Sequence, residues 1–368
     1  MHVPAGDDGG AAGGGLSKQQ RMLLDALAGA AAGCASRIIV APLDLVKIRL
    51  QVQLEPVLGA SAVSKYTGFT NAVSTVLREE GVLGLWRGTV PGLLLTVPYT
   101  AVQFVALQQV KDAAARFGWA QRDGPWSSVV SLGSGAVAGA AATVASYPFD
   151  LLRTTLAAQG EPKVYRSMID AARGICREHG VVGLYRGLGV TLVEIVPYAA
   201  LQFGLYDALS AAWTRAAAAK AKEAGAPPPP PDKLQAFTCG LLAGLVAKLA
   251  SHPLDVAKKR YQVAGLPRSL RYGARVESRL AARPLLACLA DIYQREGLAG
   301  LWKGSVPSMI KAAPAAALTF TAYEALVAWM LAGVEARQAE ERQAGEGERR
   351  RQAEGQAQQP ERRRRKGE

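Results

Sequence analysis

The stretch PLDLVK at residues 42–47 occurs twice more in the chain with the same proline, acid and base. The second copy is PFDLLR at 148–153, and the third is PLDVAK at 253–258. The copies lie 106 and 105 residues apart, so the chain consists largely of three similar units. This repeat decides the fold, because each copy is expected to form the same structure.

Two signatures precede and follow this element at similar distances in every copy. The preceding one is a pair of glycines four residues apart: Gly29 and Gly33, Gly135 and Gly139, Gly240 and Gly244. The following one runs from an acid or histidine and a glycine to an aromatic residue, a base and a glycine, at 80–88, 179–187 and 296–304. Ten residues beyond each closing glycine lies a further proline: Pro98, Pro197 and Pro314.

The composition favours a chain that is embedded in a membrane. Hydrophobic residues make up 49% of it and charged residues 20%. Each unit contains two apolar stretches, and about 20 helical residues suffice to cross a bilayer. The expected spans are 23–50, 89–111, 128–156, 190–212, 234–262 and 305–331. We therefore predict an all-α membrane protein with six transmembrane helices in three pseudosymmetric repeats. A soluble α-solenoid is the alternative, but paired glycines are typical of close helix contacts in membranes.

The segments around these spans define the expected domain organisation. Repeat 1 is expected at 23–115, repeat 2 at 125–215 and repeat 3 at 234–332. Residues 216–233 form an Ala/Pro-rich linker, and residues 1–22 and 335–368 are predicted to be disordered. The beginning of the chain has neither the apolar core of a secretory signal nor an arginine-rich amphipathic pattern, so no cleaved presequence is expected.

Charge and reactive residues narrow the function classes. The 43 lysines and arginines exceed the 30 acids, which indicates an anionic partner: nucleic acid, anionic lipid or a small anion. Four scattered cysteines and three histidines predict neither a disulfide framework nor a metal site, and no cofactor is expected. No nucleophile, base and orienting group converge, so an enzyme is not expected.

Each repeated element places an aspartate and a base within an expected membrane span. A charge at mid-bilayer costs about 2.5 to 3.5 kcal/mol on insertion scales unless it is paired or hydrated. The economical arrangement pairs each aspartate with a base of another repeat around a central axis. The expected pairs are Asp44 with Arg153, Asp150 with Lys258, and Asp255 with Lys47. The proline before each acid is expected to kink its helix and bring the three helices together there.

Helical periodicity indicates what else faces this axis. Arg37, Thr143 and Lys248 each lie seven residues before an aspartate, a spacing that returns to nearly the same helix face. On the other three spans, residues four apart form stripes: Leu95, Tyr99 and Gln103; Glu194, Tyr198 and Gln202; Lys311, Ala315 and Thr319. A cavity between these faces would contain Arg37, Lys248 and Lys311 against one acid, Glu194. This combination suits a multivalent anion that also has a cationic or hydrogen-bonding part.

These elements resemble the mitochondrial carrier family over residues 23–332. The resemblance implies a threefold bundle in the inner mitochondrial membrane, with a short matrix helix in each repeat. It also implies alternating access, with the three ion pairs as a matrix gate that Gln51 and Gln262 brace. The resemblance implies a glutamine at the same position of every repeat, but repeat 2 has Ala157 there. For the cytoplasmic gate, the matching residues are Lys111, Asp207 and Glu324, and Ser210 and Val327 stand where bases are usual.

Four stretches, at 41–51, 147–160, 194–207 and 311–320, resemble the branch of that family that carries thiamine pyrophosphate. This resemblance implies import of that anion in exchange for a nucleotide or related phosphate. Arg37, Lys248 and Lys311 would hold the pyrophosphate, and Gln103 and Gln202 would meet the aminopyrimidine. Tyr99, Tyr198 and Glu194 are the remaining candidate substrate contacts.

The family resemblance also implies partners and leaves other functions open. Cardiolipin is the expected lipid partner, the protein is expected to be a monomer, and no nucleic acid is expected to bind. One alternative is a carrier of another phosphorylated cofactor, an adenine nucleotide or coenzyme A. Another is a scaffold or proton-leak protein that transports no organic substrate.

Overall fold

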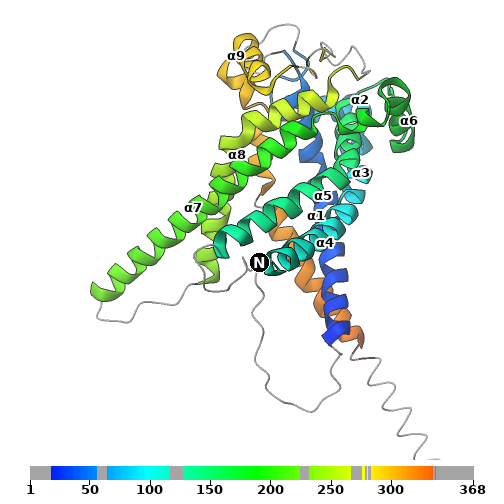
Figure 1. Cartoon of the computed structure of the whole chain (residues 1–368). Coiled ribbons are helices and arrows are strands. Elements are labelled where there is room, and N and C mark those ends of the chain that lie inside the picture. Colours follow the sequence, from blue (N-terminus) through cyan, green and yellow to red (C-terminus); the bar gives the residue numbers. More distant parts are fainter. Residues whose placement is uncertain are drawn as a thin grey trace, which may run out of the picture. The chain divides into compact units, whose positions relative to one another are not determined.

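A computed structural model describes residues 18–55, 64–116, 127–223, 232–266, 276–277, 280, 283–312, 314–334 and 336. Within these ranges every regular element is helical, as the sequence predicts (Figure 1). The α-helices are α1 (Lys18–Val52), α2 (Phe69–Glu80), α3 (Thr89–Leu94), α4 (Thr96–Arg116), α5 (Ser127–Ala158), α6 (Met168–His179), α7 (Leu188–Glu223), α8 (Lys233–Val263), α9 (Leu285–Leu301) and α10 (Ser305–Ile310). Two short 3₁₀ helices are η1 (Val82–Trp86) and η2 (Val181–Tyr185), and residues 314–334 are also helical.

The chain divides into two units. Unit 1 comprises residues 1–36 and 317–368, and unit 2 comprises residues 37–316. In unit 1, the Tyr323 hydroxyl donates a hydrogen bond of 3.3 Å to the Asp25 carboxylate. Unit 2 contains all three Pro-x-Asp-x-x-basic elements, and the candidate site is therefore described within it.

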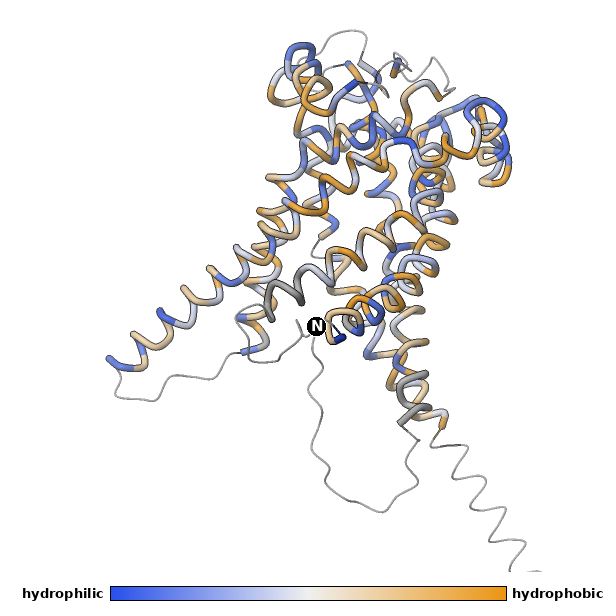
Figure 2. Tube along the Cα trace, in the orientation of Figure 1, coloured by the Kyte–Doolittle hydropathy of each residue, from blue (hydrophilic) through white to orange (hydrophobic). Residues whose placement is uncertain are grey.

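Several long helices have the length and the surface of membrane spans. Within the described residues, five segments are long and apolar enough: Leu24–Val52, Val82–Arg116, Val181–Glu223, Leu234–Val263 and Ser305–Val334. Helix α5 has 32 residues, enough to cover about 48 Å at 1.5 Å per residue. Large apolar side chains such as Phe104 and Val97 are exposed, by 72% and 68%. Figure 2 shows hydrophobic residues distributed along the long helices, as expected of membrane spans.

The core of unit 2 lies where the spans meet the short helices. Helix α4 packs along α5, and α7 packs along α8. The short helices α2, α6 and α9 lie at one end of this unit, at the top of Figure 1. There Leu45, Val46, Tyr66 and Val76 are buried in one cluster, and Tyr147 and Ile175 belong to a second. Along the chain, one of these short helices follows each Pro-x-Asp-x-x-basic element.

Glycines stop the short helices. Gly81 and Gly180 end α2 and α6 with φ of 71° and 68°, and Gly297 interrupts α9 with φ of 70°. Their ψ angles lie near 180°, a backbone conformation that is essentially restricted to glycine. Hence the acid–glycine or histidine–glycine pair in each repeat fixes the point at which the short helix stops and the chain changes direction.

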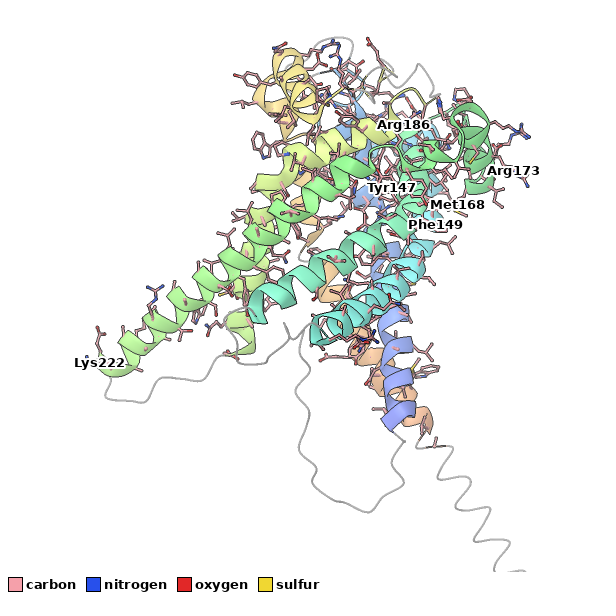
Figure 3. The ribbon with its side chains drawn as sticks, viewed as in Figure 1. Tyr147, Phe149, Met168, Arg173, Arg186 and Lys222 are labelled. Carbon is pink, nitrogen blue, oxygen red and sulfur yellow. The ribbon has the colours of Figure 1, made fainter. Side chains whose placement is uncertain are left out.

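The described helices extend into two of the expected flanking segments. Helix α1 begins at Lys18, inside the segment 1–22 that was expected to be disordered, and α7 continues to Glu223, inside the expected linker 216–233. Residues 216–223 are mostly alanine and lysine, which have high helix propensity and prolong α7. Figure 3 shows Lys222 at its tip. Residues 1–17, 224–231 and 337–368, which include most of the expected terminal segments, lie outside the described residues.

Candidate functional site

The three predicted ion pairs are all present in unit 2. Lys47 Nζ lies 2.6 Å from Asp255 Oδ2, and Lys258 Nζ lies 3.3 Å from Asp150 Oδ2. Arg153 forms a direct ion pair with Asp44. We call these three pairs the ion-pair layer. Since each pair joins helices of two different repeats, the layer ties α1, α5 and α8 together.

The two glutamines predicted to brace these pairs contact two of the three aspartates. Gln262 Nε2 donates to Asp150 at 2.9 Å, and Gln51 Nε2 donates to Asp255 at 3.4 Å. Ala157, at the third position, has no side-chain amide that could contact Asp44. Asp44 instead forms a second ion pair, with Lys311. Each aspartate therefore has a second polar partner, but only two of these partners are glutamines.

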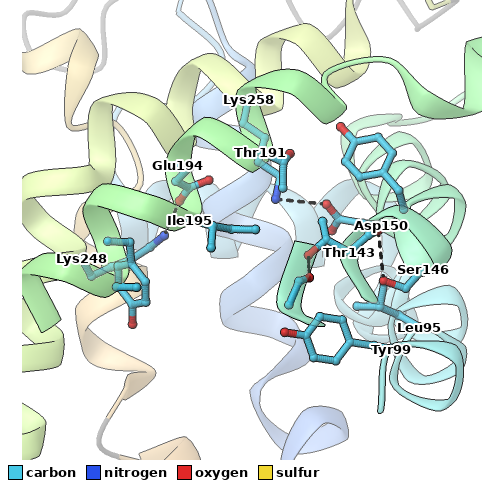
Figure 4. Close-up of a pocket in the computed structure, with 14 residues that line it drawn as sticks. Leu95, Tyr99, Thr143, Ser146, Asp150, Thr191, Glu194, Ile195, Lys248 and Lys258 are labelled. Atoms are coloured by element: carbon cyan, nitrogen blue, oxygen red, sulfur yellow. Dashed lines mark hydrogen bonds and ion pairs between the residues drawn. The ribbon is translucent and has the colours of Figure 1, made fainter. Parts of the chain in front are cut away.

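A cavity of about 570 Å³ lies against this layer (Figure 4). It is lined by Leu95, Tyr99, Gly139, Thr143, Ser146, Tyr147, Asp150, Thr191, Glu194, Ile195, Tyr198, Ala199, Lys248 and Lys258. Glu194 and Lys248 lie on one side of the cavity, and Asp150 and Ser146 lie on another. Because Asp150 and Lys258 are members of the ion-pair layer, the layer forms part of the cavity wall.

Four of the eight predicted substrate contacts line this cavity: Tyr99, Glu194, Tyr198 and Lys248. Lys248 is the most connected of them. Its Nζ lies 3.2 Å from Glu194 Oε1 and 3.1 Å from Asp255 Oδ2. It also lies 5.8 Å from the centre of the Tyr198 ring, within the range of a cation–π contact. Lys248 thus joins the cavity to the ion-pair layer.

The other four predicted contacts are not among the residues that line this cavity. Arg37 Nη1 donates to the carbonyl of Gly92 at 2.8 Å, and Lys311 is turned toward Asp44. Long basic side chains reach partners that helical periodicity does not reveal. Gln103 on α4 and Gln202 on α7 are half-buried beyond the lined part of the two stripes.

The residues expected at the opposite gate are only partly described. Asp207 on α7 and Glu324 in the segment 314–334 are exposed. The side chain of Lys111 lies outside the described residues. For these three residues, the expected gate role stays a prediction.

Lys259 and Thr154, which the sequence pattern did not single out, both contact Asp150 of the ion-pair layer. Lys259 Nζ donates to Thr154 Oγ1 and to Gln262 Oε1, each at 2.8 Å. Both residues are buried. The only signal in the sequence is the pair of consecutive lysines, Lys258 and Lys259, where repeats 1 and 2 have a single base followed by Ile48 or Thr154.

Comparison of the sequence with known proteins identifies the family to which the chain belongs. The model of the mitochondrial carrier protein family matches residues 18–117, 125–216 and 230–333. Mitochondrial thiamine diphosphate carrier 1 of Arabidopsis thaliana is 48% identical over 325 residues, which cover 86% of this chain and 97% of the relative. The mitochondrial thiamine pyrophosphate carriers of Bos taurus and Homo sapiens are 37% and 36% identical over 299 residues. These residues cover 81% of this chain and 90% and 89% of the relatives. With three family matches, one to each repeat, this chain belongs to the mitochondrial carrier protein family.

Proposed function

We propose that this protein carries thiamine diphosphate across the inner mitochondrial membrane, importing it in exchange for a nucleotide or related phosphate. Membership of the family makes it a mitochondrial membrane protein with several spans. The relatives' names supply the cargo, since they are called thiamine diphosphate or thiamine pyrophosphate carriers at 36 to 48% identity. The observation that carries the proposal is Lys248, a cation shared between the cavity and the ion-pair layer.

The chemistry of the cavity supports this cargo. Its volume of about 570 Å³ lies within the range of about 300 to 1,000 Å³ that is usual for cofactor-sized ligands. A diphosphate requires bases, and Lys248 supplies one within the cavity. A thiazolium ring carries a positive charge, which suits the Glu194 carboxylate and the faces of Tyr99 and Tyr198. In this proposal Arg37 and Lys311 join Lys248 at the diphosphate after they leave Gly92 and Asp44, and Gln103 and Gln202 contact the aminopyrimidine.

The contacts of Lys248 suggest how cargo acts on the gate. In the structure this lysine contacts Asp255, which also pairs with Lys47. A diphosphate that binds Lys248 competes with Asp255 for the same ammonium group and so weakens one corner of the layer. Lys311 offers the same competition at Asp44. Binding is then coupled to alternating access, because cargo contacts the closed and open layers differently.

Lipid and oligomeric state complete the proposal. A cavity of about 340 Å³ is lined by Gly68 and Phe69 at the start of α2 and by Trp302, Lys303 and Gly304 before α10. The starts of two helices suit a lipid phosphate, and we assign this cavity to cardiolipin. One chain supplies both the substrate cavity and the layer, so the proposed transporter is a monomer. We propose transport without catalysis, because cavity hydroxyls such as those of Thr143 and Ser146 bond to carbonyls of their own helix.

Exchange in liposomes tests the function. The purified protein is reconstituted into vesicles that contain unlabelled thiamine diphosphate, and uptake of the labelled compound is measured. Uptake should depend on the internal substrate and should be inhibited more by thiamine diphosphate than by ADP or coenzyme A. Uptake of labelled ADP alone, with no exchange of thiamine diphosphate, would instead identify a nucleotide carrier. No exchange of any of these anions would end the proposal.

A further inference from the structure

The ends of α1, α5 and α8 meet at three junctions, which we number by the repeats that they join. Two of these junctions are clamped by a buried arginine. At the 1–2 junction, Arg49 donates to the carbonyls of Ala157 and Gln159, both at 3.0 Å, and pairs with Glu80. These contacts tie the end of α1 to the following repeat and to its own short helix α2.

The 3–1 junction has the same construction. Arg260 donates to the carbonyls of Gln51 and Gln53, both at 3.2 Å. Its Nη2 also lies 2.8 Å from Glu296 Oε2 on α9. The side chains of this arginine and this glutamate are 3% and 2% exposed. Both clamps are therefore charge pairs removed from water.

The 2–3 junction has no such clamp among the described residues. Thr155 stands where the other repeats have Arg49 and Arg260, and its hydroxyl donates to Leu151 of its own helix at 2.9 Å. His179 stands in place of the partner glutamate, directly before Gly180. Arg186 still donates to the carbonyl of Ala264. This junction has lost both members of the buried charge pair.

A different cation occupies this junction. Lys259 on α8 is 7% exposed and contacts Thr154 on α5 and Gln262, each at 2.8 Å. Its Nζ lies 3.7 Å from Asp150 Oδ1. Because Gln262 Oε1 accepts from Lys259, the amide nitrogen of Gln262 points at Asp150. Lys259 thereby orients the glutamine and adds a second base to the Asp150–Lys258 pair.

We propose that Lys259 is an additional gate residue, a positioning residue that replaces the missing arginine clamp and keeps the 2–3 junction closed. Its role as a gate residue rests on the proposed function, but the contacts that it makes do not. Lys259 does not line the cavity, which separates this role from that of a substrate ligand. Without it, Gln262 Oε1 keeps only the Thr154 hydroxyl as a donor among the described residues, and Asp150 keeps one lysine instead of two.

Accessibility of the cavity tests this role without any substrate. Thr143→Cys places a thiol in the cavity wall, and a membrane-impermeant thiol reagent is added from the junction side of oriented vesicles. The same protein without Thr143→Cys corrects for the four native cysteines. Lys259→Met should raise labelling from this side about tenfold, and Lys259→Arg should restore most of the closure. The control Lys163→Met, at an exposed loop lysine, should have no effect.

Two results would overturn the proposal: unchanged labelling in Lys259→Met, or labelling that rises equally from both sides, which indicates general loosening. If Lys259→Met does not fold, Thr154→Val removes the hydroxyl that Lys259 contacts and should raise labelling about threefold from the junction side only. Because no substrate is added, a failure of thiamine diphosphate exchange leaves this result interpretable.

Discussion

The 2–3 junction differs from its two counterparts in where its support lies. The 1–2 and 3–1 junctions are held outside the ion-pair layer, by Arg49 with Glu80 and by Arg260 with Glu296. The 2–3 junction is held within the layer itself, by Lys259 and Gln262 around Asp150. Three nearly identical sequence elements thus form three junctions that are supported by different residues. We therefore expect loss of a support outside the layer to lower mainly the stability of the fold, and loss of a support within the layer to affect mainly its opening.

The largest expected effect comes from removing an outer clamp. Arg49→Met leaves Glu80 buried with Arg87 alone, at 2.6 Å. Removing one partner of a buried pair costs about 3 to 5 kcal/mol when it leaves an unpaired charge. Because Arg87 still pairs with Glu80, we expect a loss of about 2 to 3 kcal/mol, from the hydrogen bonds that Arg49 makes to Glu80 and to the two carbonyls. Thermal unfolding in detergent should show a large loss of stability. The matched control is Thr155→Val at the corresponding position of repeat 2, which removes one local hydrogen bond and should cost about 1 kcal/mol. Equal losses in the two variants would contradict the difference between the junctions.

A moderate effect is expected from adding the missing glutamine. Gly187 and Gly304 lie against Gln262 and Gln51, and Gly88 lies against Ala157 in the same way. By this equivalence, we expect the side chain of Ala157→Gln to extend past Gly88 toward Asp44. One added hydrogen bond is worth about 0.5 to 1.5 kcal/mol, so exchange should slow about two- to tenfold as the closed layer becomes more stable.

The measurement for Ala157→Gln is the initial rate of exchange together with the unfolding temperature. A slower exchange rate together with a raised unfolding temperature would show that the added glutamine stabilises the closed ion-pair layer. A slower rate with a lowered unfolding temperature would show overpacking of the buried site instead, and the predicted symmetry between the three glycines would be incorrect.

The smallest expected effect concerns the short helices of repeats 2 and 3. Helix α9 is held by the buried Arg260–Glu296 pair, and α6 has no equivalent pair among the described residues. Burial raises the pKa of the Cys288 thiol on α9 to about 11. At pH 8 about one thiol in a thousand is then ionised, and the reactive thiolate forms only as the pH approaches 11. Half-buried Cys176 on α6 should therefore react with maleimide faster than Cys288.

Mass spectrometry of the labelled peptides measures this difference. We expect Cys288 to react at least tenfold more slowly than Cys176 at pH 8, and the rate of Cys288 should keep rising as the pH approaches 11. In denaturant the two rates should converge. Similar rates in the folded protein would show that α9 opens as readily as α6.

The sequence predicted the elements that repeat and missed those that differ. The all-α membrane fold is confirmed, and the three ion pairs form between the residues expected, because periodicity and the cost of an unpaired charge leave few arrangements. The contact of Lys311 with Asp44 was not predicted, since long side chains select partners through packing. Lys259 was missed because it has no basic counterpart in repeats 1 and 2. Helices α1 and α7 continue beyond the expected apolar spans because local helix propensity prolongs them.

The central claim is that cargo and the ion-pair layer share Lys248. Its most direct test is exchange of labelled thiamine diphosphate by Lys248→Met, compared with the exposed control Lys163→Met at equal amounts of folded protein in the vesicles. Loss of a charge-assisted contact to the diphosphate should reduce exchange by about 100-fold, and the control should match the unmodified protein. Exchange by Lys248→Met within about twofold of the control would contradict the account.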